Sequence, residues 1–259
     1  MIFLLIQGRI SQFVIFLVLC FLMLTSLWLS RRKPIFKLRK IAPLDAIEEV
    51  IGRCAEMGRP LLMVPGIEGV TAQTLAGLTV TNYATTLAAR YDVEPIMLIA
   101  VQDVYPLALE NVRLAFQAEG KADKFRPEMV RFVYSQFPMA TTAMGIIHRQ
   151  KVAGTIMVGG FYAETLMILE NAYKAGAVQV GGTANYHNIP FFVAVCDYAL
   201  IGEEIFAASA YLSKDPEQIG TIVGEDFGRM FLSLLAIIGA ILATLGAAYG
   251  KWFTDLLSI

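Results

Sequence analysis

The sequence predicts an α/β protein with a mostly parallel, doubly wound (Rossmann-like) sheet of about six strands, flanked by an N-terminal and a C-terminal transmembrane helix. Between residues 43 and 230, short apolar runs alternate with helix-length segments, which is the pattern of repeated βαβ units. The apolar runs are continuous, as expected for strands that are buried on both faces. Uncharged runs at 10–30 and 231–250 are each long enough to cross a hydrocarbon core about 30 Å thick.

These patterns divide the chain into five segments. They are an N-terminal transmembrane helix (1–30), a basic juxtamembrane linker (31–42), an α/β domain (43–230), a C-terminal transmembrane helix (231–250) and a short tail (251–259).

Composition supports a membrane-attached domain and argues against a nucleic-acid partner. Hydrophobic residues make up 56% of the 259 residues and charged residues only 17%, and the apolar excess is concentrated at the two ends. Residues 41–230 contain 13 basic and 21 acidic residues, a net charge of −8. An acidic domain lacks the basic surface that phosphate backbones require.

The expected elements follow in order. Strands are expected at 61–64, 95–101, 129–133, 152–158, 177–180 and 191–195, and helices at 43–57, 71–91, 105–119, 139–149, 161–170, 198–212 and 217–230. The segment 152–170, a strand, a Gly159-Gly160 turn and a helix, stands at the centre of this series. Because the turn lacks the GxGxxG spacing of a dinucleotide site, we interpret it as a tight turn in the middle of the sheet.

A basic cluster after the first apolar run predicts the orientation in the membrane. Its members are Arg31, Arg32, Lys33, Lys37, Arg39 and Lys40, whereas only Arg9 precedes the run. The positive-inside rule therefore places the cluster and the α/β domain in the cytoplasm and both termini outside, in a two-pass arrangement. The run is too long, and its basic residues too late, for a cleaved signal peptide. The cluster could also hold anionic lipid headgroups.

The second apolar run carries small residues at helical spacing, among them Gly239, Ala243, Gly246 and Gly250. Small residues on one stripe allow helix backbones to approach closely. We expect this stripe to pack against the first span or against the same span of a neighbouring copy, although glycine and alanine are also simply common in membrane helices.

Polar residues follow the predicted strands, at the edge where ligands bind in open parallel sheets. The candidate ligand-binding residues are Glu68, Asp103, Glu164, Asn185, His187, Asp197 and Glu204, with Gln102, Ser135, Gln136 and Glu203 beside them. If these acids and amides converge, they suit a cation, a hydroxyl-rich small molecule or a polar partner better than a phosphate. The alternative is that acids in first helical turns simply complement the helix dipole.

No catalytic, metal or cofactor site is predicted. Neither GxxxxGK[ST] nor GxSxG occurs, the two histidines are not spaced as a ligand pair, and Cys20, Cys54 and Cys196 form no CxxC. The cysteines are expected to be small buried hydrophobic residues.

Several stretches of the α/β domain together resemble a known family. They are Pro43-Leu44-Asp45-Ala46, Gly58-Arg59-Pro60, Val64-Pro65-Gly66, Gln73-Thr74-Leu75-Ala76-Gly77-Leu78, Ala88-Ala89-Arg90-Tyr91, Phe161-Tyr162-Ala163-Glu164, Pro190-Phe191-Phe192-Val193-Ala194-Val195-Cys196-Asp197-Tyr198, Ile201-Gly202-Glu203-Glu204 and Phe206-Ala207-Ala208-Ser209-Ala210-Tyr211-Leu212-Ser213. The chain resembles prokaryotic membrane-anchored proteins grouped only as a domain of unknown function (number 6754). The resemblance covers about residues 43–229, implies one continuous domain in a prokaryotic cell membrane, and implies no activity.

Three functions remain open from the sequence. The preferred one is a self-associating scaffold or organising subunit at the cytoplasmic face of the membrane, a homo-oligomer through its C-terminal helix and domain surface. The second is a small-molecule sensor or enzyme that uses the polar strand ends. The third, an accessory subunit of a transport complex, rests on topology alone.

Overall fold

A computed structural model of the chain describes residues 10–32 and 41–245. The chain divides into two compact units. One, the helical unit, comprises Met1–Leu38 and Lys214–Ile259, and the other, the α/β unit, comprises Arg39–Ser213.

The α/β unit consists of six strands and seven α-helices in its described residues. The strands are β1 (Leu61–Val64), β2 (Pro95–Ile99), β3 (Val130–Phe132), β4 (Gly154–Val158), β5 (Val178–Thr183) and β6 (Tyr198–Ile201). The helices are α2 (Ala42–Met57), α3 (Ala72–Arg90), α4 (Tyr105–Ala118), α5 (Gln136–Gln150), α6 (Glu164–Lys174), α7 (Ile189–Val195) and α8 (Glu204–Ser213), with 3-10 turns η1 (Ala122–Lys124) and η2 (Pro127–Met129) before β3.

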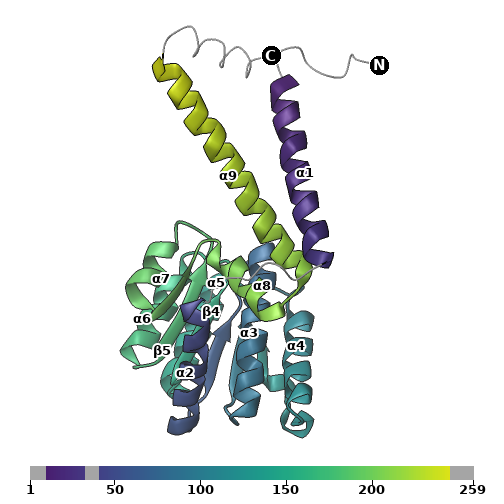
Figure 1. The fold of residues 1–259 in the computed structure, drawn as a ribbon. Helices are drawn as coiled ribbons and strands as arrows, with labels where there is room; N and C mark the ends of the chain where they lie inside the picture. Colours follow the sequence, from purple (N-terminus) through teal and green to yellow (C-terminus); the bar gives the residue numbers. More distant parts are fainter. Residues whose placement is uncertain (1–9, 33–40, 246–259) are drawn as a thin grey trace. The chain divides into compact units, whose positions relative to one another are not determined.

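The six strands form one sheet in the order β3-β2-β1-β4-β5-β6, of which β4 and β5 are labelled in Figure 1. Every neighbouring pair is parallel, with β1 paired to β2 on one side and to β4 on the other. This order is that of a Rossmann-type sheet, in which the chain reverses its winding between β1 and β4. The predicted fold class of the domain is therefore confirmed.

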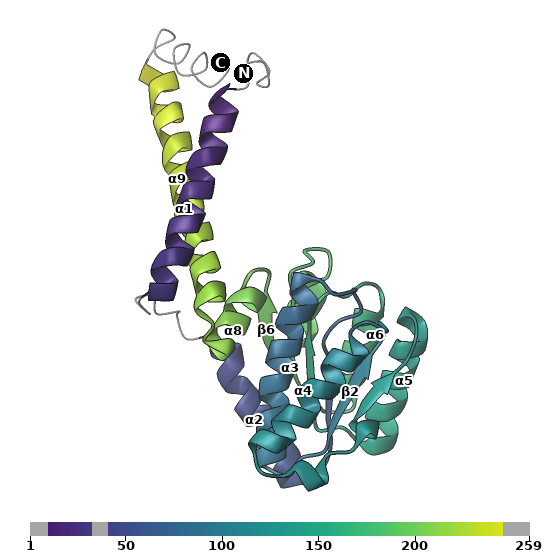
Figure 2. The same cartoon turned by 90° about the vertical axis from the view of Figure 1, so that its right-hand side faces the viewer.

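Helices cover both faces of the sheet (Figure 2). Two separate apolar cores are buried between the helices and the sheet, one on each face. Residues of α2, α3, α4 and α8 form one core and residues of α5, α6 and α7 form the other. Within β1, Leu61 and Met63 belong to the first core and Leu62 and Val64 to the second. This alternation is the reason that the strands are apolar along their whole length.

The predicted sixth strand was wrong. Residues 191–195 lie in helix α7, and the sixth strand is β6, at the start of the segment predicted to be helical. Of the apolar run, Phe192 is buried but Phe191 and Val193 are exposed, and Pro190 stands in the first turn, where proline suits a helix. A short apolar run does not by itself distinguish a strand from a helix.

The central strand-turn-helix unit at 152–170 is confirmed, and its glycine turn packs against the turn after β1. Gly66 and Gly159 have φ values of 98° and 149°, which favour glycine. The amide of Ile67 donates to the Gly160 carbonyl at 2.8 Å. Helix α3 approaches the same point so closely that a Cβ on Gly77 would overlap the Val158 carbonyl oxygen.

The helical unit contains α1 (Ile10–Arg32) and α9 (Pro216–Leu245), which pack antiparallel. The Ser30 hydroxyl donates to the Pro216 carbonyl at 2.7 Å and the Ser26 hydroxyl to the Gly220 carbonyl at 2.8 Å. Gly224 faces Met23 and Ser26, and Gly228 faces Leu19. The spacing of four between these glycines removes side chains from the contact, so the helices approach closely.

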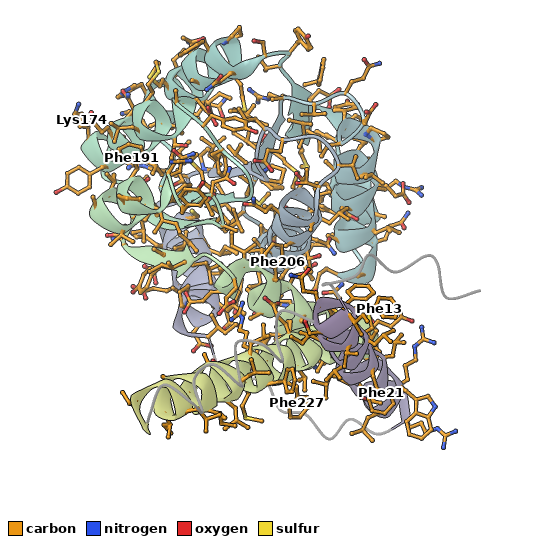
Figure 3. All side chains as sticks on the ribbon, turned by 90° about the horizontal axis from the view of Figure 1, so that it is seen from above. Phe13, Phe21, Lys174, Phe191, Phe206 and Phe227 are labelled. Atoms are coloured by element: carbon orange, nitrogen blue, oxygen red, sulfur yellow. The ribbon has the colours of Figure 1, made fainter. Side chains whose placement is uncertain are left out.

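One helix among the described residues, α1, is long and apolar enough to cross a membrane, with a mean hydropathy of 2.5. Large apolar side chains project from the unit, including Phe13 and Phe21 on α1 and Phe227 on α9 (Figure 3). Residues 246–250 of the second predicted span lie outside the described residues.

Replacing Gly77 by alanine is expected to destabilise the α/β unit by roughly 2–3 kcal/mol, because the new methyl group forces α3 away from the sheet. Gly52→Ala is the matched control: it also lies inside a helix, and its Cβ would meet nothing within 4 Å. The control is expected to gain roughly 0.5–1 kcal/mol from helix propensity. Thermal unfolding of the full chain, followed by circular dichroism, measures both; equal effects of the two substitutions would contradict the close packing.

Candidate functional site

Polar side chains from several loops meet at the carboxyl edge of the sheet, beside the switch point between β1 and β4. The contributing segments are the β1–α3 loop, the first turn of α3, the β4–α6 loop and the β5–α7 loop. In doubly wound sheets this is the crevice where ligands bind.

Glu68 is the centre of this network. Its Oε1 accepts a hydrogen bond from Asn185 Nδ2 at 2.9 Å, and its Oε2 accepts one from the Thr71 hydroxyl at 3.3 Å. The carboxylate lies over the backbone of Gly160, in space that a Cβ at that position would fill. Glu68 therefore ties the β1–α3 loop to the β5–α7 loop, across the backbone of the β4–α6 loop.

Asn185 links Glu68 to two further loops. Its Nδ2 also donates to the Phe161 carbonyl at 3.1 Å, and its Oδ1 accepts from Gln73 Nε2 at 2.9 Å. Gln73 Oε1 in turn accepts from the Ala184 amide at 3.0 Å. Asn188 Nδ2 donates to the same Phe161 carbonyl. The amides thus fix the β5–α7 loop against the first turn of α3.

Glu164 forms a second, adjoining cluster. This first residue of α6 is fully buried. Its Oε2 accepts from Gln136 Nε2 at 2.6 Å and its Oε1 accepts from the Tyr162 amide at 2.9 Å. Ser135, which precedes Gln136, has φ 79° and ψ 155°, a region that costs a residue other than glycine about 1–3 kcal/mol.

Tyr162 lies between the two clusters. The negative charge of Glu68 is the main cause of a raised pKa of the Tyr162 hydroxyl, followed by partial burial, a hydrogen bond to Glu68 and the charge of Glu164. The nearby carboxylates therefore favour the neutral, protonated form of the Tyr162 phenol.

The other four predicted ligand-binding residues form no hydrogen bond to Glu68, Asn185 or Glu164 among the bonds found in the described part of the chain. Asp103 lies exposed in the turn after β2, and the ring of His187 packs on Tyr186 with centroids 4.1 Å apart. Glu204 accepts from the Ile201 amide at 2.9 Å at the end of the edge strand β6. Asp197, expected after the sixth strand, precedes β6 and accepts from the Gln179 amide at 2.8 Å. It therefore lies at the opposite edge of the sheet.

The sequence prediction missed Gln73, Thr71 and Tyr162. Thr71 caps α3 by accepting from the Thr74 amide, and its place before a helix was a visible capping signal. Gln73 lies within the first turn of α3, and the rotation of that helix decides where its side chain points.

Of the six residues of the basic cluster, the structure describes Arg31 and Arg32. Arg31 pairs with Glu217 at 2.6 Å, and the Arg32 guanidinium lies 4.0 Å from the centre of the Trp28 ring. Lys33, Lys37, Arg39 and Lys40 lie outside the described residues, as do Gly246 and Gly250 of the small-residue stripe.

A dinucleotide does not fit the switch point as it stands. In a Rossmann fold the pyrophosphate binds at the β1–helix loop and the helix N-terminus. Here Glu68 occupies that loop, and the loops after all six strands contain no lysine or arginine. A phosphate would meet a carboxylate without any compensating cation.

Metal and thiol chemistry find little support in the described part of the chain. There, no three His, Cys, Asp or Glu side chains are close enough to hold a metal ion. Burial raises the pKa of Cys54 and of Cys196 to about 12. Both thiols are therefore protonated at neutral pH and are poor nucleophiles.

A cavity of about 310 Å³ lies at the opposite, amino edge of the sheet. It is lined by Asp92, Val93, Glu94, Phe116, Asp123, Lys124, Arg126 and Met129. Much of its charge is paired within the protein: Asp92 bonds Lys121 and Lys124 at 2.8 and 2.6 Å, and Arg126 bonds Glu94 at 3.0 Å. These pairs link the α3–β2 and α4–β3 connections.

The fold and site together define an α/β protein with a Rossmann-order sheet, a helix long and apolar enough to cross a membrane, and a carboxylate in the loop after β1. A family model described as a domain of unknown function (DUF6754) matches residues 3–254. The chain therefore belongs to this family. Comparison with curated proteins and with solved structures found no match.

Asn185→Asp is expected to lower the free energy of unfolding by roughly 2–3 kcal/mol, because it places a second carboxylate against Glu68 and leaves the Phe161 carbonyl without this donor. Adding Glu68→Gln supplies an amide donor to the new carboxylate and is expected to restore about 1 kcal/mol. Thermal unfolding of the two single variants and the double variant measures this coupling. A double variant no more stable than Asn185→Asp would show that the two side chains do not interact.

Asp92 predicts a pH-dependent contribution to stability. Hydrogen bonds from Lys121 and Lys124 lower the pKa of Asp92 from 3.8 to about 2, so the contribution is present above pH 3.8 and is lost as the pH falls toward 2. Asp92→Asn removes the charge but suits the left-handed backbone (φ 57°). The melting temperature of the parent should exceed that of the variant at pH 6, and the gap should close between pH 4 and 2. A constant gap would contradict the assignment.

Proposed function

We propose that the chain is a membrane-anchored, self-associating α/β protein that serves as a scaffold or organising subunit at the cytoplasmic face of a prokaryotic membrane. Three features support this role. The helical unit carries an apolar surface suited to lipid, and the described residues form no metal cluster. The acids at the carboxyl edge are used to hold loops together.

The observation that best supports self-association is which residues of α1 and α9 lie side by side. Ser30, at the end of the first apolar run, lies beside Pro216, and Leu19 lies beside Gly228. Glu225, Asp226 and Arg229 are exposed on this part of α9, with Glu225 and Arg229 paired at 2.5 Å. A bilayer centred on α1 would therefore contain all three charged side chains.

Such charges are costly in contact with lipid, at about 2.5–3.5 kcal/mol each near the bilayer centre, and in known proteins they face the interior of a bundle. A second copy of the helix pair covers them if the polar faces of two α9 helices meet. The small residue Gly239 lies further along the same helix and offers a close contact for the apolar half.

The two-pass arrangement, with the α/β unit in the cytoplasm, belongs to the same proposal. It is supported by the antiparallel course of α1 and α9 and by the basic residues after α1. Phe231, the start of the second span, lies about 15 residues (~22 Å) beyond Pro216, so the two spans are offset along the pair. A single cysteine in the tail 251–259 that reacts with an impermeant maleimide only from the cytoplasm would overturn this sidedness.

Light scattering of the detergent-solubilised chain is expected to give the mass of a dimer or larger oligomer. Replacing Glu225, Asp226 and Arg229 together by alanine should shift the mass toward the monomer, because the charges that require shielding are gone. Glu110→Ala with Arg113→Ala is the control, since this exposed pair lies on α4 of the α/β unit at 2.7 Å. A parent that is monomeric at all concentrations would contradict the proposal.

A second function is favoured by the carboxyl edge itself: recognition of a polar ligand or partner. Several loop and helix-start segments converge there on Glu68, Asn185 and Glu164, and the strained Ser135 lies beside them. Strained backbone concentrates at binding and catalytic sites.

A further inference from the structure

Four exposed aromatic side chains lie on the segments that follow β3, β4 and β5, at the carboxyl edge of the sheet. Their exposed fractions are 76% for Tyr134, 56% for Phe137, 52% for Tyr162 and 75% for Tyr186. We call these four residues the aromatic edge. Aromatic groups of this size usually bury most of their surface, so several exposed ones at one edge of a fold indicate an interaction site.

Two hydrogen-bonded links fix the spacing of the aromatic edge. Gln136, next to Phe137, bonds Glu164 at 2.6 Å, and Glu164 holds the amide of Tyr162 at 2.9 Å. Asn185, next to Tyr186, bonds the carbonyl of Phe161, next to Tyr162, at 3.1 Å. The segments that carry Phe137, Tyr162 and Tyr186 are therefore tied to one another through residues next to the rings.

The charge of this edge has one sign. Because all six strands are parallel, the loops after them lie at one edge. Those loops contain Glu68, Asp103 and Glu203 and no lysine or arginine, and the exposed Glu204 begins α8, whereas Glu164 at the start of α6 is buried. The opposite edge carries Lys121, Lys124 and Arg126 among acids. An aromatic surface with acids and without bases attracts cations through both ring faces and carboxylates.

We propose that the aromatic edge binds an arginine- and lysine-rich segment of another protein. This inference rests on the second proposed function, recognition at the carboxyl edge, and names the partner chemistry. Guanidinium groups stack on Tyr and Phe faces and bond carboxylates at their rims. Nucleic acid and anionic lipid carry the same sign of charge as the edge and are repelled by it.

The test uses the full chain in phosphatidylcholine nanodiscs and a fluorescent peptide of alternating Arg and Gly, with a Glu-Gly peptide of equal length as the reference. Fluorescence anisotropy should show binding of the Arg peptide alone. Its affinity should fall at least several-fold between 50 and 300 mM salt, because exposed charges are screened. Tyr186→Ala and Tyr162→Ala should each weaken binding by about 3–10-fold.

Tyr173→Ala is the matched control, because Tyr173 is 68% exposed but lies near the end of α6, at the amino edge. It should bind the peptide as the parent does. Equal affinity of Tyr186→Ala and the parent, or an equal loss in Tyr173→Ala, overturns the assignment, as does tight binding of the Glu peptide. Light scattering on the same samples distinguishes peptide binding from self-association. A variant that loses peptide binding but keeps the oligomer mass of the parent is altered at the aromatic edge alone.

Discussion

The turns after β1 and β4 press against each other at the centre of the sheet, and the carboxyl edge is arranged around this contact. A Cβ on Gly66 would lie 2.8 Å from the backbone N and O of Gly160, so neither turn tolerates a side chain there. Because the backbones touch, Glu68 reaches across Gly160 to Asn185. Without the close approach, the carboxylate and the amide would belong to separate loops.

Because the strands are parallel, the two edges of the sheet differ in chemical character. Each strand delivers its following loop to the same edge, so the composition of six short loops determines the character of one surface. The absence of lysine and arginine from those loops makes that surface acidic. In this Rossmann-order sheet the loop before α3, where a phosphate would bind, instead carries the carboxylate of Glu68, which bonds the hydroxyl of the N-cap residue Thr71.

Much of the fold and part of the site could be predicted from the sequence. Continuous apolar runs separated by helical segments predict a parallel sheet. Residues that follow parallel strands lie at the carboxyl edge of the sheet, and Glu68, Asn185 and Glu164 do lie there. The run 191–195 was ambiguous because five apolar residues have no readable period, and the error moved Asp197 to the wrong edge. Gln73 could not be found because its role depends on the rotation of α3. The four-residue spacing of the glycines at 220, 224 and 228 could have predicted a helix contact. They lie among charged residues before the apolar run 231–250, and the prediction considered only that run.

The β1 and β4 turns form one rigid unit that positions the polar groups of the carboxyl edge. Hydrogen–deuterium exchange of the full chain tests this rigidity at the amide of Ile67 in the β1 turn, which donates to the carbonyl of Gly160 in the β4 turn at 2.8 Å. This amide is expected to exchange as slowly as those of strand β1, through global unfolding. Exchange as fast as that of the exposed turn at Asp103 would contradict it.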